Sequence, residues 1–127
     1  MLVKSKPVAL SSFDLDSLDE SDDNHEAIEF DILLNDSPDN KWCEEFEIAY
    51  RVMPNNIKPP VHINEDRMRI AYLPRYERDL PSYIDYLKSV VAVANEEVRK
   101  TEAIAKHSHR AEHIESFRTT LRRMRLD

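Results

Sequence analysis

The chain has 127 residues and a net charge of −7, and it contains no glycine, whereas average usage would supply roughly nine. Without glycine it cannot form a P-loop, a dinucleotide-binding fingerprint or a kinase glycine-rich loop, because each brings a backbone without Cβ against a phosphate. A single cysteine, a charged and broken N-terminus and no apolar run of about 20 residues lead us to expect one cytoplasmic domain without disulfide, signal peptide or membrane span.

Residues 1–24 are expected to form an acidic, disordered tail. Serine and acidic residues dominate positions 11–24, where Phe13, Leu15 and Leu18 are the only apolar side chains. Three large side chains do not offset an ordering cost of about 1–2 kcal/mol per residue. Apolar residues between carboxylates are also typical of acidic docking peptides. The tail is therefore either a solubilising linker or a recognition segment that becomes ordered on a partner.

Residues 25–127 are expected to form a single α+β domain, with a sheet over about residues 26–73. Apolar and polar side chains alternate there with the period of two that is typical of half-buried strands. The expected strands are residues 26–34, 42–52, 61–63 and 68–72. Short turns join them and predict a four-stranded antiparallel meander. Its solvated face is expected to place acidic side chains across from two arginines: Glu29, Asp31, Glu45 and Glu47 across from Arg67 and Arg69.

The turns of this sheet have to be made without glycine. Asparagine is the next-best residue for a positive φ. Asparagines fall in each of the predicted connections: Asn35, Asn40, Asn55, Asn56 and Asn64. We expect them to adopt that conformation.

A long helix over about residues 81–105 is expected to cover one face of the sheet. Pro81 suits the first helical turn. Two adjacent apolar stripes then cover about half of the helix circumference. The stripes consist of Ile84, Leu87, Val91, Ala94 and Val98, and of Tyr83, Tyr86, Val90 and Val93.

A second helical segment is expected over about residues 109–126. Its apolar stripe has a 3, 4, 3 spacing and consists of Ile114, Phe117, Leu121 and Met124. At 100° per residue this stripe is centred near 180°, roughly opposite the first stripes near 10°. One straight helix therefore cannot bury both stripes against the same sheet. Either the chain breaks at residues 106–109 and folds back, or the second half projects and docks elsewhere.

Candidate chemical groups in the chain are few. His109 and His113 have the i, i+4 spacing of two metal ligands, but His107 faces elsewhere on the helix and no further ligand joins them, so we predict no metal site or cofactor. Cys43 is expected near Glu45 and Glu47 on the same strand, where carboxylates raise the pKa of a thiol. We therefore predict no catalytic residue.

Charge is distributed unevenly along the chain. Residues 1–40 carry two lysines and eleven carboxylates, whereas residues 99–127 carry eight basic and four acidic side chains. The acidic head and the basic end can attract one another within the chain or between copies, and salt would weaken this attraction. The low overall isoelectric point argues against nucleic-acid binding.

The sequence thus predicts a non-catalytic, regulatory protein-interaction module. Its partner would be another protein or a second copy, as in a homodimer, and membrane binding is not expected. The expected contact residues are Ile114, Phe117, Leu121 and Met124 with Arg118 and Arg122, and secondarily Phe13, Leu15 and Leu18. The alternative is an acidic inhibitor, immunity-like or DNA-mimicking, of a basic toxin or nucleic-acid enzyme. Dense carboxylates on a rigid face would favour that alternative.

Overall fold

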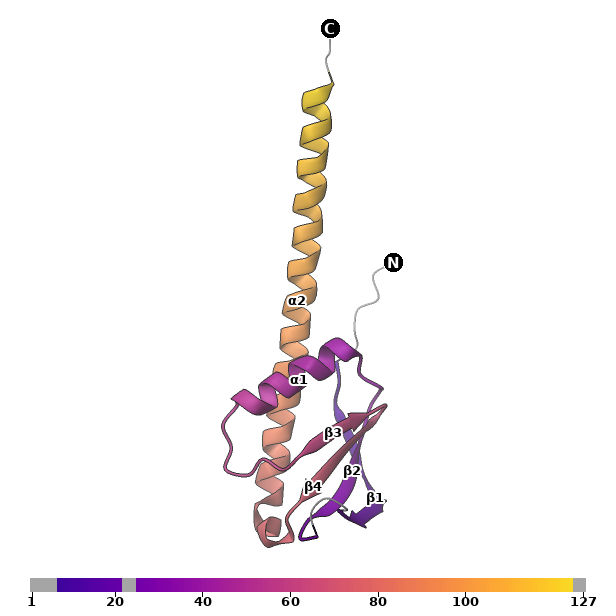
Figure 1. Ribbon diagram of the computed structural model, residues 1–127, viewed down its shortest axis with the longest axis vertical. Coiled ribbons are helices and arrows are strands. Elements are labelled where there is room, and N and C mark those ends of the chain that lie inside the picture. Colours follow the sequence, from indigo (N-terminus) through magenta and orange to yellow (C-terminus); the bar gives the residue numbers. More distant parts are fainter. Residues whose placement is uncertain (1–6, 22–24, 125–127) are drawn as a thin grey trace.

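The computed structural model describes residues 7–21 and 25–124, together with the side chains of all of these except 104–113. The described elements are β1 (Leu10–Glu20), β2 (Ile28–Leu34), α1 (Asn40–Val52), β3 (Val61–Asn64), β4 (Arg67–Tyr72), the 3-10 helix η1 (Pro74–Asp79) and α2 (Leu80–Arg123). The sheet, α1 and the first part of α2 form a domain, and the rest of α2 projects from it (Figure 1).

The four strands form one antiparallel sheet in the order β1-β2-β4-β3. This confirms the predicted α+β class with a four-stranded antiparallel sheet and a long helix. The strand order differs from that of a meander because α1 lies between β2 and β3 in the chain. The chain leaves the sheet after β2, returns at the far edge as β3, and then inserts β4 beside β2.

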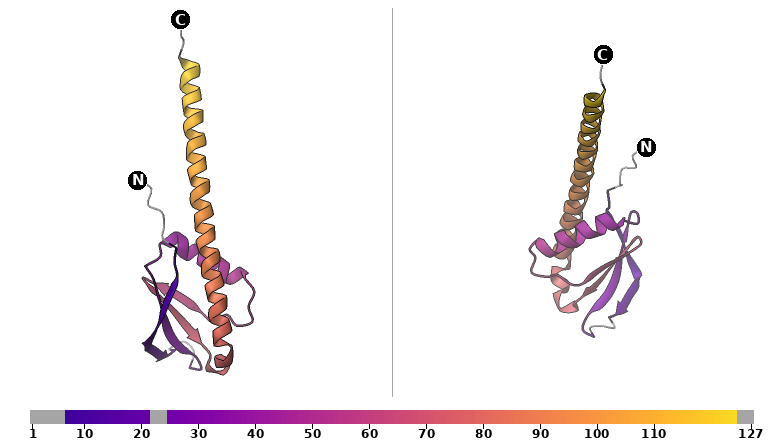
Figure 2. Two further views of the ribbon diagram at one scale, coloured as in Figure 1. Left: turned by 180° about the vertical axis from the view of Figure 1, so that it is seen from behind. Right: turned by 45° about the horizontal axis from the view of Figure 1, so that its top comes forward.

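The hydrophobic core lies between one face of the sheet and the two helices (Figure 2). The sheet contributes Ile32, Met68 and Ile70, each at most 2% exposed. These side chains alternate along β2 and β4 with the polar residues of the opposite face, as expected for strands with one buried side. The helices contribute the rest of the core, chiefly Trp42, Phe46, Tyr83, Leu87, Val90, Ala94 and Val98.

The predicted strand at residues 42–52 is wrong, because this segment is helix α1. The Asp39 side chain caps the helix by accepting a hydrogen bond from the Trp42 backbone N–H at 2.8 Å. Trp42, Phe46 and Tyr50 satisfy the alternation of a strand and also the i, i+4 spacing of a helix, and they stack at 5.3 and 5.8 Å between ring centroids. The cap by Asp39 stabilises the helix over the strand. The carboxylates predicted to face arginines from this segment therefore lie on α1, outside the sheet.

The predicted disorder of residues 1–24 is also wrong for much of that segment, because residues 10–20 form the edge strand β1. The strand is held by polar contacts, which the small number of apolar side chains in this segment does not indicate. The Asn35 side chain accepts a hydrogen bond from Ala9 N–H at 2.9 Å and donates one to Pro7 O at 3.0 Å. Arg67 reaches Asp14 across the sheet at 2.7 Å. Residues 1–6 and 22–24 lie outside the described ranges.

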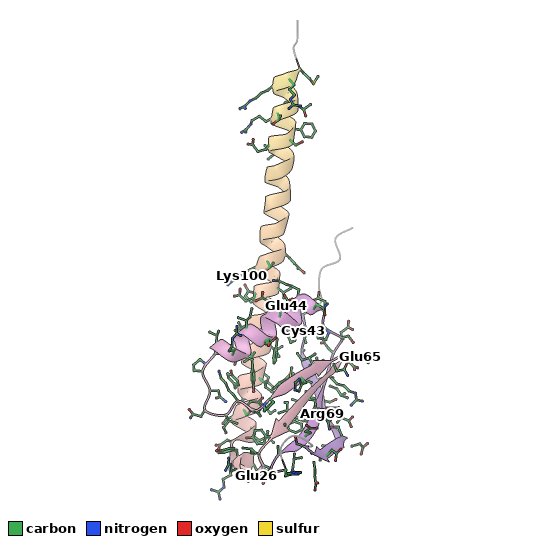
Figure 3. All side chains as sticks on the ribbon, viewed as in Figure 1. Glu26, Cys43, Glu44, Glu65, Arg69 and Lys100 are labelled. Carbon is green, nitrogen blue, oxygen red and sulfur yellow. The ribbon has the colours of Figure 1, made fainter. Side chains whose placement is uncertain are left out.

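Helix α2 runs without interruption from Leu80 to Arg123, so both predicted helical segments are parts of one helix. No break occurs at residues 106–109. The structure therefore has the projecting arrangement of the two alternatives (Figure 1). Lys100 lies where the helix leaves the domain (Figure 3). Residues 125–127 lie beyond the described part.

The turns differ from the prediction for asparagine. Within the described ranges, the only residue with a positive φ is Glu65, at 55°. It lies in the two-residue connection between β3 and β4, where hairpin twist favours a positive φ at the first position. Asn35 instead contributes its side-chain amide to holding the segment before β1.

Candidate protein-interaction surfaces

The first half of α2 is fixed firmly in the domain. Tyr83, Leu87, Val90 and Ala94 are at most 1% exposed. They follow one another at spacings of four, three and four residues, so every turn of this half enters the core. The direction in which the second half projects is therefore set by the packing of the first.

Asn95 links three elements of the domain at the upper end of this packed half. Its side-chain oxygen accepts hydrogen bonds from the Val8 backbone N–H at 3.0 Å and from the Trp42 indole N–H at 2.7 Å. Its amide nitrogen donates to Val8 O at 2.9 Å. One side chain thus joins α2 to α1 and to the segment that leads into β1. A single polar residue beside the apolar stripe of α2 was the only sequence signal for this role.

A tyrosine cluster closes the lower part of the core. The Tyr50 hydroxyl donates to Pro59 O at 2.6 Å and lies 2.9 Å from the Tyr83 hydroxyl, so Tyr83 is the donor between them. Tyr86 donates to the backbone oxygens of Tyr50 and Met53. Burial raises the pKa of Tyr50 to about 12 and that of Tyr83 further. These hydroxyls are protonated at neutral pH and act as structural hydrogen-bond donors.

The second half of α2 carries an exposed apolar surface. We use the name C-terminal stripe for Ile114, Phe117, Leu121 and Met124, which are 58–69% exposed. Their spacing repeats after seven residues, which places Ile114, Phe117 and Leu121 in a single row along the helix, with Met124 at its C-cap. Arg118 and Arg122 line the same surface. All six residues predicted for this site therefore lie together on one side of the projecting helix.

The charges around the C-terminal stripe are mainly positive. Arg118 donates to Glu115 at 2.8 Å within the same helix, an exposed pair of small energetic value. Arg122 and Arg123 occupy the last turn, where they complement the negative end of the helix dipole. The C-terminal stripe is thus an apolar row with a positively charged rim.

The second predicted surface lies on β1, far from the C-terminal stripe. Phe13, Leu15 and Leu18 are 51–76% exposed. Phe13 pairs in register with Ile32, so it lies on the helix-covered side of the sheet, but the helices leave it uncovered. Its ring is 6.4 Å from that of Phe30. The neighbouring carboxylates Asp16 and Glu20 are exposed as well. Asp19 pairs in register with Glu29, on the opposite face of the sheet. We use the name β1 patch for Phe13, Leu15, Asp16, Leu18 and Glu20.

The opposite face of the sheet carries an ion-pair network. Asp31, only 7% exposed, accepts from Arg67 at 3.0 Å and from Arg69 at 2.8 Å. Arg69 also binds Glu29 at 3.0 Å, and Figure 3 places Arg69 on β4. The hydrogen bond from Arg67 lowers the pKa of Asp14. This confirms the predicted pairing of Glu29 and Asp31 with the two arginines, whose charges neutralise much of this acidic face.

The remaining candidate groups are Cys43 and the metal-ligating side chains. Cys43 is half-buried on α1 (Figure 3), and the pKa of its thiol is raised by burial first and by Asp39 second. The direction matches the prediction, but the carboxylates predicted to cause it do not. No group of three or more His, Cys, Asp and Glu side chains in described positions could hold a metal ion. The side chains of His107, His109 and His113 lie outside those positions.

Comparisons with known proteins give no relative. No protein-family model matches the chain, and no curated protein or solved structure is significantly similar to it. Along its described residues, α2 has no stretch apolar enough to cross a bilayer, and neither has α1.

Proposed function

We propose that this chain is a small, non-catalytic protein-interaction module of the cytoplasm that docks on another protein chain through the C-terminal stripe. The observation that carries the proposal is the exposure of four large apolar side chains, 58–69% each, in one row of a projecting helix. Burying such side chains in a contact yields about 1.5–3 kcal/mol each. Left uncovered, a contiguous apolar surface promotes aggregation. A regulatory role follows if a signal controls access to this helix.

The stiffness of the helix base adds support. Since the packed half of α2 is anchored near its end by the hydrogen bonds of Asn95 and by the buried Val98, the stripe is held at a fixed distance and direction from the domain. An isolated helix must first form a nucleus, which is the costly step of helix formation. The packed half of α2 supplies this nucleus for the projecting half, which is then preorganised for binding.

Site-specific photocrosslinking in cells tests the proposal. A benzophenone amino acid replaces Phe117 in the C-terminal stripe, and the matched control replaces Thr119, which lies about 200° around the helix. We expect a protein adduct from position 117 and little from position 119. Equal labelling at both positions, or none at either, would contradict a docking role for the stripe.

The acidic-inhibitor function is the second candidate, and the order of β1 favours it. Asp16, Asp19 and Glu20 are exposed on a strand that is part of the sheet, so their charges have defined positions. The arginines on the opposite face weaken this alternative, because they pair with Asp14, Glu29 and Asp31. A benzophenone at Leu15 separates the two functions. An adduct there with a basic enzyme, and none at position 117, would replace the first proposal by this one.

A further inference from the structure

Two exposed surfaces of this molecule are apolar and opposite in charge. The C-terminal stripe has Arg118 and Arg122 beside it, and the β1 patch has Asp16 and Glu20. We infer that the C-terminal stripe of one copy docks on the β1 patch of a second copy, so that the chain forms a head-to-tail homodimer. This inference rests on the proposed docking role of the stripe and names its partner.

The two surfaces cannot meet within one chain. The helix is continuous, and at 1.5 Å per residue Ile114 lies about 28 Å along the axis beyond Asn95. Asn95 binds Val8, which marks the end of the domain where β1 begins. From there β1 runs away from the projecting half of α2 (Figure 2). Contact with a β1 patch therefore requires another molecule.

Charge decides between the β1 patch and a second stripe as the partner surface. If two stripes pair, the arginines that line them, Arg118 and Arg122 of each copy, come together in an apolar contact. Like charges brought together at an interface disfavour the contact. On the β1 patch the same arginines meet carboxylates. Opposite charges there also steer the two copies toward each other, most strongly at low salt.

The dimensions of α2 allow both contacts to form at once. The helix has 44 residues, about 66 Å, of which residues 80–98 pack in the domain for about 28 Å and residues 99–123 project for about 38 Å. Two copies with antiparallel α2 helices thus place each projecting half beside the domain of the other. A two-fold arrangement makes the contact twice, doubles the buried area and closes the assembly. A single contact of this kind, repeated without closure, would give filaments.

Charge reversal tests the inference with the full chain. The variant of the C-terminal stripe, called the tail variant, carries Arg118→Glu and Arg122→Glu. The variant of the β1 patch, called the head variant, carries Asp16→Lys and Glu20→Lys. A control variant, Glu44→Lys with Glu47→Lys, lies on the exposed side of α1 and changes the net charge from −7 to −3, as the head variant does, whereas the tail variant changes it to −11. Solution mass is measured by light scattering at low and high salt, with circular dichroism as the check of folding.

We expect the unmodified chain and the control variant to have twice the mass of one chain at low salt and a reduced mass at high salt. The tail and head variants should each be monomeric alone. Mixed in equal amounts they should form dimers again, because one contact is then native and the other has both charges exchanged. This rescue cannot result from misfolding of either variant.

Two results would overturn the inference while leaving the proposed function intact. A dimer that is lost in the tail variant but kept in the head variant would mean that stripes pair with each other. An unmodified chain that is monomeric at low salt, together with an adduct between position 117 and a different protein, would assign the stripe to that protein. Failure of the proposed function itself would appear as the absence of any adduct specific to position 117.

Discussion

From Tyr83 to Val98, α2 turns one apolar row into the core, and from Ile114 to Met124 it carries a row of similar spacing that stays exposed. The local sequences of the two halves are alike in periodicity, and each by itself would predict a helix with one buried face. They differ in phase, since the two rows lie on opposite sides of the helix. The angle between the two rows around the helix axis, more than the hydrophobicity of either row, indicates that a single helix makes two different contacts.

The largest expected difference between the two halves follows from placing the same charge in each. Leu87→Asp puts a carboxylate where the native side chain is 0% exposed, and burying an unpaired charge is strongly unfavourable. We expect this variant to lose its cooperative melting transition. Leu121→Asp, on the exposed row, should leave the melting temperature nearly unchanged and abolish association. Thermal melting by circular dichroism and light scattering check both outcomes. Global unfolding of Leu121→Asp would assign its row to the core.

An intermediate effect is expected at the boundary between the halves. Asn95→Ala removes the acceptor of the Trp42 indole and both partners of Val8. Leaving one such group without a partner costs about 1–3 kcal/mol. Three groups are affected, so the free energy of unfolding in urea should fall by at least about 3 kcal/mol. Asn55→Ala, in an exposed loop, is the matched control. Equal stability of the two variants would mean that Asn95 does not hold the base of the projecting half.

The smallest effect concerns alkaline pH and the lower end of the packed half. The pKa of Tyr50 is raised to about 12 by burial, and that of Tyr83 is raised further. Because a raised pKa favours the protonated form in the folded state, this stability is complete below pH about 10 and is lost as pH rises toward the folded values. Tyr83→Phe removes one of these groups and leaves the Tyr50 hydroxyl its bond to Pro59. Between pH 9 and 12 the melting temperature of the variant should therefore fall less steeply than that of the unmodified chain, because one titrating tyrosine is absent. An equally steep fall in both proteins would contradict this prediction.

Much of the fold could be predicted from periodicity, and the failures have physical causes. Strands β2, β3 and β4 and both parts of α2 follow from alternation or from a 3, 4 spacing. The alternation predicts a strand where helix α1 lies, because its aromatic residues fit both periods and only the N-cap Asp39 distinguishes the two. Strand β1 was missed because it is ordered by hydrogen bonds and ion pairs with distant residues such as Asn35 and Arg67. The local pattern of hydrophobic residues does not indicate contacts with residues that are distant in sequence.

The candidate surfaces were easier to predict than the strands. The C-terminal stripe follows from its spacing and from its phase relative to the core row, both of which are local properties of the sequence. The apolar residues of the β1 patch were recognised too, but as part of a flexible tail. Their place on a sheet edge depends on pairing with β2, which the sequence alone did not indicate.

The most direct test of the account compares the full chain with a chain that ends at Lys106. Solution mass and melting temperature are measured for both at low and high salt. We predict that the full chain is a dimer, that the shortened chain is a monomer, and that their melting temperatures extrapolated to low concentration agree, because the packed half of α2 is complete in both. A shortened chain that melts much lower, or that keeps the mass of a dimer, would contradict the division of α2 into a packed half and a docking half.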